Sequence, residues 1–267
     1  MTSSTPNAVG RAVFSASDGV AWLSLENPAR MNAISLAMWQ QIADAVRRYE
    51  QDETLRCLII RGAGEKAFAS GADISEFDSL RTGDAVHVYD AAAKDSMTLL
   101  EATRKPTIAV VNGYCIGGGV ALALCCDIRL ASDDARFSIP AARLGLGYDY
   151  VGIKRLVDLV GPSRAKLIFF SARRFGADEA KSIGVVDMVV PKAHLTAEAN
   201  ELVKNIADNA PLTIAAAKRA IATTQTAPQH QDISAVEAMA TACFASEDYA
   251  EGRRAFAEKR LPKFKGC

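Results

Sequence analysis

Hydrophobic positions follow two different rhythms along the first two thirds of this 267-residue chain. Short runs such as 57–60 and 107–111 are apolar at nearly every position, whereas the stretches between them repeat apolar residues every three to four positions. Continuous apolar runs are typical of strands buried on both faces, and helices between such strands are typical of parallel sheets. The pattern therefore predicts an α/β fold built on a mainly parallel sheet.

Turn and capping residues set the expected element boundaries. Asp18-Gly19 separates two strand-like segments and predicts a β-hairpin over 11–17 and 20–25. Ser35 is placed to cap a helix that runs to about Tyr49. The same reasoning predicts helices over 83–103 and 118–126 and strands over 107–111 and 127–131.

The pattern changes after residue 191, where only helical periodicity continues to about residue 260. Pro211 and Pro228 mark breaks between these helices. These helices alone are not expected to bury a separate hydrophobic core. We therefore expect a disordered tail over 1–9, a core over 10–200 and a C-terminal helical region over 201–267.

Composition narrows the classes of function. The formal net charge is zero, which disfavours a nucleic acid or an anionic membrane as partner. The six cysteines lack CxxC spacing and the three histidines are widely separated, so we expect no metal site. The first residues carry no basic-then-apolar leader pattern, and reduced cysteines suit the cytoplasm, where we expect the protein to reside.

Two glycine-containing turns carry the most chemical information. In IAVVNGYCIGGG (108–119) an apolar run ends at Asn-Gly and three glycines open a helix, and FASGADISE (68–76) repeats a strand, a glycine and an acidic helix start. Such turns expose backbone N–H groups to a ligand. One N–H from each turn, aimed at a single oxygen atom, would form an oxyanion hole.

Six segments together resemble the crotonase, or enoyl-CoA hydratase/isomerase, superfamily. They are NPARMNAIS (27–35), AFASGADISEF (67–77), KPTIAVVNGYCIGGGVALALCCDIRLAS (105–132), RFSIPAARLGLG (136–147), RLVDLVG (155–161) and EDYAEGRRAFAEKRLPKF (247–264). The resemblance implies a ββα-superhelix (spiral) core with a C-terminal helical trimerisation region. It also implies a homotrimer or a dimer of trimers, and an acyl-CoA thioester as substrate, with coenzyme A entering as part of that substrate and no other cofactor.

The resemblance also assigns site residues. The amides of Ala72 and Gly118 would form the oxyanion hole. The coenzyme A site would be formed by Arg30, Ser70, Ala72, Ile74 and, from a neighbouring subunit, Lys259 and Phe264. The acyl pocket would be lined by Tyr114, His87, Ala121, Ala141 and Tyr148.

The acid–base positions depart from the hydratase pattern. Hydratases of this superfamily carry one glutamate in the helix after the glycines and another directly after the proline of the FxxP motif. In this sequence those positions hold Ala121 and Ala141, and alanine can neither donate nor accept a proton. Water addition requires a group that activates water and one that delivers the α-proton. The two-glutamate mechanism is therefore not supported.

Asp149, in GLGYDYVG, offers a replacement. The segment resembles the dienoyl-CoA isomerases and 4-chlorobenzoyl-CoA dehalogenase, whose catalytic aspartate occupies this place. Tyr148 and Tyr150 flank Asp149, so we expect a carboxylate in an apolar neighbourhood that acts as a base. The same residue is equally suited to cap a helix over 151–160, and both roles stay open at this point.

Isomerase-type proton transfer through an enolate, with Asp149 as base, is the function that we expect. Decarboxylation or hydrolysis of an acyl-CoA is also compatible with an oxyanion hole that is assisted by few side chains. A dehalogenase function is less well supported, because the sequence shows no identifiable pocket for an aromatic substrate. The alternatives are an enoyl-CoA hydratase with an atypical active site and a non-catalytic acyl-CoA binding protein. An RNA-associated relative is disfavoured by the scattered basic residues.

Overall fold

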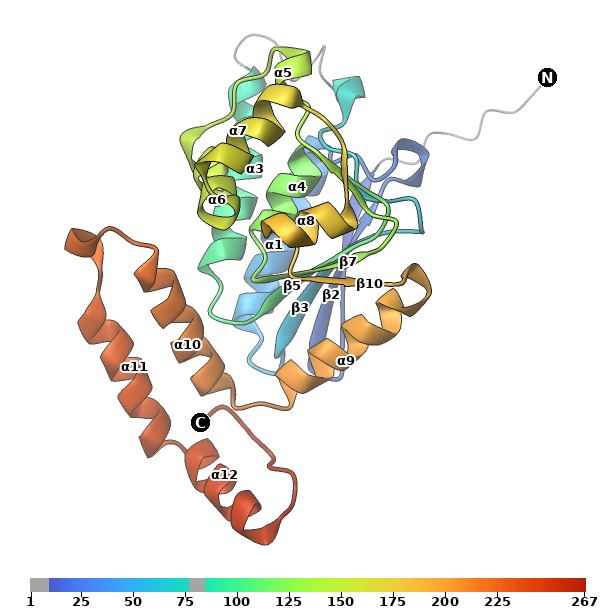
Figure 1. Cartoon of the computed structure of the whole chain (residues 1–267). Coiled ribbons are helices and arrows are strands. Elements are labelled where there is room, and N and C mark those ends of the chain that lie inside the picture. The colour runs from blue at the N-terminus through green and yellow to red at the C-terminus, as the bar shows by residue number, and fades with distance from the viewer. Residues whose placement is uncertain (1–9, 77–84) are drawn as a thin grey trace.

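The computed structural model describes residues 10–76 and 85–267 and builds them around a six-stranded sheet (Figure 1). Its order is β1-β2-β3-β5-β7-β10, and all neighbouring pairs are parallel except β1 and β2, which form the predicted hairpin. The strands are β1 (Arg11–Ser17), β2 (Val20–Glu26), β3 (Cys57–Gly62), β5 (Thr107–Val111), β7 (Ile128–Ser132) and β10 (Met188–Val190). The predicted mainly parallel sheet is confirmed.

A second sheet of four short strands lies beside the first, in the order β4-β6-β8-β9. Its members are β4 (Ala67–Ala69), β6 (Tyr114–Ile116), β8 (Arg136–Ser138) and β9 (Phe175–Gly176). Along the chain β4 follows β3, β6 follows β5 and β8 follows β7. The chain therefore places one strand in each sheet and then a helix, which is the ββα spiral arrangement. As a result, the two glycine turns follow adjacent parallel strands, β4 and β6.

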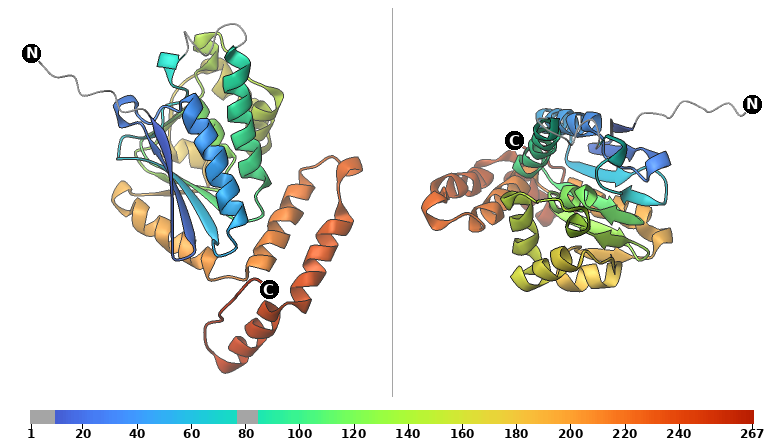
Figure 2. Two further views of the ribbon diagram at one scale, coloured as in Figure 1. Left: turned by 180° about the vertical axis from the view of Figure 1, so that it is seen from behind. Right: turned by 90° about the horizontal axis from the view of Figure 1, so that it is seen from above.

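Helices α1 (Leu36–Gln51), α3 (Ala85–Ala102) and α4 (Gly118–Leu124) cover one side of the large sheet (Figures 1 and 2). Ser35 caps α1 as predicted, because its hydroxyl accepts a hydrogen bond from the Met38 amide at 3.2 Å. The helix predicted over 118–126 ends two residues early, because the amides of Cys125 and Cys126 donate to the carbonyls of Leu122 and Ala123, three residues earlier, instead of continuing the α-helical pattern. The residues 83 and 84 of the predicted long helix lie outside the described ranges.

Shorter helices follow on the same side of the core as α4: α5 (Ala141–Leu144), α6 (Tyr150–Val160), α7 (Pro162–Ser171) and α8 (Ala177–Ile183). The opposite face of the large sheet is covered by α9 (Leu195–Ala207), whose Leu195, Ala199 and Val203 pack against the strands. The boundary predicted between residues 200 and 201 therefore falls inside a helix of the core, because the apolar face of α9 is buried on the sheet.

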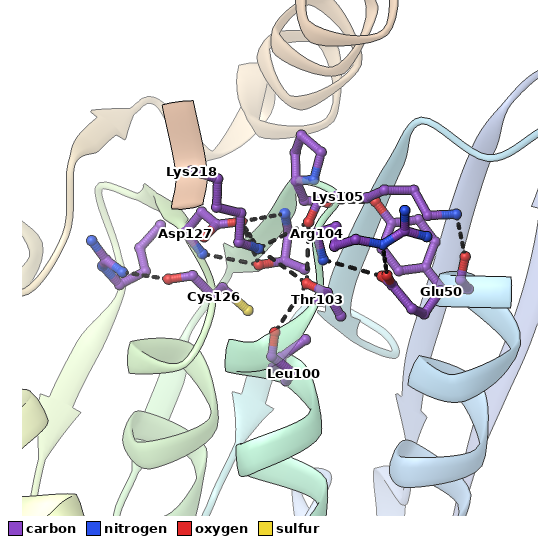
Figure 3. Close-up of polar contacts among 12 residues, drawn as sticks. Glu50, Leu100, Thr103, Arg104, Lys105, Cys126, Asp127 and Lys218 are labelled. Atoms are coloured by element: carbon purple, nitrogen blue, oxygen red, sulfur yellow. Dashed lines mark hydrogen bonds and ion pairs between the residues drawn. The ribbon is translucent and has the colours of Figure 1, made fainter. Parts of the chain in front are cut away.

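The last helices stand away from both sheets: α10 (Pro211–Thr224), α11 (Ile233–Ala245) and α12 (Glu247–Glu258) (Figures 1 and 2). Lys218 of α10 joins this arm to the core (Figure 3). Its Nζ donates to Asp127 Oδ2 at 2.7 Å, to the Lys105 carbonyl at 2.9 Å and to Thr103 Oγ1 at 3.0 Å. Asp127 also accepts from the Thr107 amide at 2.8 Å, so one carboxylate links the arm to a central strand.

Lys218→Met is expected to lower the free energy of unfolding by about 1–3 kcal/mol, because half-buried acceptors would lose their shared donor. Urea denaturation of the full chain measures this change. Arg219→Met is the matched control, since it removes a positive charge from the next, exposed residue of the same helix. An equal loss in both variants would show that the contacts of Lys218 do not fasten the arm.

The buried cysteines are free thiols that pack as small apolar groups. Burial raises the pKa of Cys57 and of Cys126 to about 12, so both remain protonated at neutral pH. Within residues 10–76 and 85–267, no three or more His, Cys, Asp or Glu side chains gather in a way that could hold a metal ion. No helix in these ranges is both long and apolar enough to cross a membrane.

Candidate active site

A cavity of about 500 Å³ opens between α3, α5 and the two glycine turns. Ala72 of the first turn and Gly118 of the second lie on its wall. Most of the wall is apolar, with Trp39, Met97 and Leu146 among its members. The cavity therefore brings together the two backbone segments that the sequence singled out.

The Ala72 amide is turned away from the neighbouring chain by a single β-bridge. Ile34 pairs in parallel with Ala72, its amide donating to the Gly71 carbonyl at 2.7 Å and its carbonyl accepting from the Asp73 amide at 3.0 Å. In a parallel bridge of this kind the central residue directs its own N–H to the other side. In the described part of the chain the Ala72 amide has no acceptor.

The second amide belongs to Gly118, the first residue of α4. Gly117 precedes it at φ 52° and ψ −112°, a conformation that only glycine adopts readily, and its own amide donates to the Ser138 carbonyl at 2.8 Å. A Cβ placed on Gly118 would lie 3.7 Å from the Ala72 nitrogen, so the two turns are in contact. Across residues 10–76 and 85–267 the Gly118 amide also finds no acceptor.

Arg30, predicted to contact coenzyme A, is held beside the first turn. Its guanidinium donates to Asp73 Oδ1 at 2.6 Å and to the Ser75 hydroxyl, and its carbonyl accepts from Ser70 Oγ at 2.9 Å. Burial alone would raise the pKa of Asp73, but hydrogen bonds from Arg30 and Ser75 outweigh it and hold that pKa below its usual value. Asp73 thus fixes the start of the short helix η2 (Ile74–Glu76), and the side chain of Ile74 lies outside the described part of the structure.

Asp149 lies at the edge of the cavity as the N-cap of α6. Its Oδ1 accepts a hydrogen bond from the Gly152 amide at 2.8 Å, which confirms the capping role. The expected apolar surroundings are a wrong prediction, because the end of α5 and the following loop leave Asp149 exposed. Its Oδ2 accepts no hydrogen bond from the residues that the structure describes, so capping leaves one oxygen available for other chemistry.

Tyr148 lies half-buried in the cavity wall, and its ring packs edge-on against Phe169 with centroids 5.1 Å apart. Ala121 and Ala141 also line the cavity. The cavity wall does not include Tyr114 or His87. Tyr114 is exposed beneath the Arg174 guanidinium, and His87 is exposed on α3.

Two charged residues of the cavity wall were missed by the sequence analysis. Asp90 and Lys94 lie one turn apart on α3, on the face that also presents Ala93 and Met97 to the cavity. Their i, i+3, i+4, i+7 spacing shows that these residues share one helix face, but it does not show that this face lines a cavity. Asp90 and Asp149 are the two carboxylates among the described residues of the wall.

Lys259 and Phe264 lie at the other end of the molecule. Lys259 terminates α12 in a left-handed conformation, and Phe264 packs against Gly252 of the same helix. Figure 1 shows α12 at the opposite end of the molecule from α5, whose residues line the cavity. A second hollow of about 560 Å³ beside α12 has mostly charged walls, in which Glu251 accepts from Arg254, Arg260 and the Lys263 amide. Because these charged groups bind one another, the hollow is not a second candidate active site.

Known proteins are similar to this chain in both sequence and fold. Residues 15–267 match the family model described as enoyl-CoA hydratase/isomerase. Crotonyl-CoA hydratase of Syntrophomonas wolfei is 37% identical over 246 residues, which cover 92% of this chain and 94% of that protein. Carnitinyl-CoA dehydratase of Escherichia coli is 36% identical over 248 residues, covering 91% and 94% of the two chains.

Solved structures show the same similarity in fold. An enoyl-CoA hydratase/carnithine racemase from Magnetospirillum magneticum has a TM-score of 0.90 at 34% identity and covers 97% of both chains. The spiral α/β fold, with two glycine turns facing one cavity, is thus of the crotonase type. The chain belongs to the enoyl-CoA hydratase/isomerase family. Membership implies an acyl-CoA thioester as substrate.

Proposed function

We propose that this protein catalyses proton transfer on an acyl- or enoyl-CoA thioester through an enolate bound by the amides of Ala72 and Gly118. The observation that carries the proposal is that both amides lie on one cavity wall, in adjacent turns, without an acceptor in the described chain. Negative charge develops on the thioester oxygen when a neighbouring C–H bond is broken. Fixed backbone donors at that oxygen lower the barrier.

Asp149 is the proposed base. Asp149 lines the cavity and its Oδ2 accepts no hydrogen bond from the described residues, and the positions that the family resemblance assigns to glutamates hold Ala121 and Ala141. In isomerisation of a 3-enoyl thioester, Asp149 takes a proton from C2, the electron pair moves onto the thioester oxygen, and the proton returns at C4. One carboxylate is sufficient for both steps, so a double-bond isomerase is the function that this site supports best.

Hydration is the second candidate, because the relatives named above are called a hydratase and a dehydratase. Adding water requires one group to activate water and another to deliver the α-proton. Asp90 and Asp149 are the carboxylate residues in the described part of the wall, and we assign these roles to them in this second candidate. The enolate and its two amides would be shared by both reactions.

Asp149→Asn is expected to slow exchange of the C2 and C4 protons of crotonyl-CoA with heavy water by about 10²- to 10⁴-fold, the usual contribution of general base catalysis. Asparagine can still accept from the Gly152 amide, so the helix cap and the melting temperature should be retained. Mass spectrometry and proton NMR measure exchange, and hydration is recorded on the same samples.

Asp90→Asn is the matched control, since it changes the other carboxylate of the wall. Loss of exchange in this variant, with normal exchange in Asp149→Asn, would move the base to α3. An unmodified chain that binds the thioester without exchange or hydration would instead support the non-catalytic acyl-CoA binding protein.

The coenzyme A moiety is proposed to lie along the first turn, near Arg30, Ser70, Ala72 and Ile74. Lys259 and Phe264 would complete the site of a neighbouring subunit, because Lys259 ends α12, Phe264 packs against Gly252 of α12, and α12 lies at the opposite end of the molecule from α5 (Figure 1). The apolar helix α11 supports a homotrimer or a dimer of trimers. None of its residues is buried in the single chain, and Phe244 is exposed.

A further inference from the structure

Asp149 caps the end of α6 that contributes no buried side chain. None of residues 150–155, all of which the structure describes, is buried, whereas Leu156 and Val160 in the second half of the helix are buried. The bond from the Gly152 amide fixes Asp149 relative to its own helix only. The place of Asp149 at the cavity therefore depends on how the first half of α6 is held against its neighbours.

Arg155 joins this part of α6 to α3, which forms another part of the cavity wall. Its guanidinium makes a two-bond ion pair with Glu101, in which Nη2 donates to Oε2 at 2.6 Å and Nε donates to Oε1. Its Nη1 lies 3.9 Å from the sulfur of Met97, a residue that lines the cavity. The Arg155 side chain is only 12% exposed. A two-bond pair of this kind fixes the orientation of the two groups as well as their distance.

The other side-chain contacts around the start of α6 lead to different elements. Tyr148 packs on Phe169 of α7, and Lys154 pairs with Asp158 of α6 itself. In the described part of the chain, every hydrogen bond between α6 and α3 comes from Arg155. Arg155 is thus the polar link that sets the spacing of these two helices near the cavity.

This spacing matters for the chemistry of Asp149. A general base must lie within hydrogen-bond reach of the proton that it removes. Because α3 supplies Ala93, Lys94 and Met97 to the wall, a change in its distance from α6 would move Asp149 relative to a thioester that lies against that wall. A misplacement of about 1 Å can lower a rate by about 10²-fold.

We infer that Arg155 is a positioning residue, which sets the place of the Asp149 carboxylate at the cavity through its contacts with Glu101 and Met97 of α3. Arg155 does not line the cavity and transfers no proton. The inference rests on the proposed function, because it takes Asp149 as the base. It applies to isomerisation and also to a hydration in which Asp149 takes part.

Arg155→Met keeps most of the side-chain length and removes the guanidinium. It should slow exchange of the C2 and C4 protons of crotonyl-CoA with heavy water by about 10- to 100-fold, while the affinity for butyryl-CoA, measured by calorimetry, changes by less than about threefold. Lys154→Met is the matched control, since it removes a positive charge from the next residue, whose partner Asp158 is on the same helix. This control should exchange like the unmodified chain.

Glu101→Gln tests the same link from the α3 side. Glutamine keeps one acceptor oxygen for Arg155 and loses the charge and the second bond. Exchange should therefore slow in the same direction as in Arg155→Met and by a smaller factor. Because Glu101 is partly exposed, this variant is expected to fold even where Arg155→Met is less stable.

The Asp149→Asn background separates positioning from a general loss of structure. If Arg155 acts through the Asp149 carboxylate, adding Arg155→Met to Asp149→Asn should change the residual exchange rate by less than about twofold. A purely structural role would slow exchange by the same factor in both backgrounds, because the cavity would be disturbed with or without the carboxylate. Melting curves from circular dichroism show that each variant is folded at the assay temperature.

The other outcomes overturn the inference. Normal exchange in Arg155→Met would show that the ion pair does not set the place of Asp149, while the proposed enolate would stand. An equal loss in both backgrounds, or a loss explained by butyryl-CoA affinity, would make Arg155 a structural residue only. Normal exchange in Asp149→Asn, or no exchange in the unmodified chain, would overturn the proposed function and this inference with it.

Discussion

Gly118→Pro should exchange the C2 protons of a bound acyl-CoA about 10²- to 10³-fold more slowly than Gly118→Ala, because proline removes one of the two backbone donors. Gly118 is the first residue of α4, a position where helices accept proline because no intrahelical bond is lost. Deuterium uptake followed by mass spectrometry measures the rates.

Gly118→Ala is the matched comparison, since it adds the same Cβ and keeps the N–H. That Cβ would meet Ala72 N and Trp39 Cζ2 at 3.7 Å, an ordinary van der Waals distance. Binding of butyryl-CoA is measured in both variants, so that loss of affinity is not mistaken for loss of rate. Equal rates in the two variants would mean that the Gly118 amide does not act on the thioester.

Gly119→Ala should lower the free energy of unfolding by about 2–3 kcal/mol and reduce exchange as well. A Cβ on Gly119 would lie 2.5 Å from the carbonyl oxygen of Ala69 and 2.9 Å from its Cβ. Since Ala69 is the last residue of β4, the strand and helix must move apart, and the turn that carries Ala72 moves with the strand. Differential scanning calorimetry and the exchange assay measure the two effects.

Gly118→Ala is again the control, because it adds a methyl group one residue earlier without a short contact. The three glycines thus have different roles. Gly117 supplies a positive φ, Gly118 an amide, and Gly119 the close packing of α4 on β4. A melting temperature of Gly119→Ala equal to that of Gly118→Ala would contradict this division.

Local signals were sufficient for the elements that lead to the site. Asp18-Gly19 fixed the hairpin, Ser35 the start of α1, and the first glycine turn the end of β4, because each depends on residues adjacent in the sequence. The short strand β6, between Asn112-Gly113 and the three glycines, was not predicted. The meeting of the turns followed from parallel pairing of those strands. The family resemblance supplied the identity of the ligand class, which neither periodicity nor spacing contained.

Other features of the site depend on packing between segments far apart in the sequence, and the sequence did not predict them. The exposure of Asp149 depends on how the short α5 and its loop lie over the core, and the position of the Tyr148 ring depends on Phe169 in another helix. Asp90 and Lys94 were overlooked because the helical repeat of α3 does not by itself say which face meets a cavity. The boundary at residue 200 failed to separate core from arm because α9 packs on the sheet.

Exchange by the unmodified chain tests the central claim most directly. Acyl- and enoyl-CoA thioesters, with butyryl-CoA and crotonyl-CoA included, are incubated with the protein in heavy water, and deuterium at the carbons next to the thioester is followed over time. An enolate held by Ala72 and Gly118 predicts uptake at C2, or at C4 of the enoyl esters, faster than in buffer alone. Thioesters that bind and yet gain no deuterium at either carbon would contradict it.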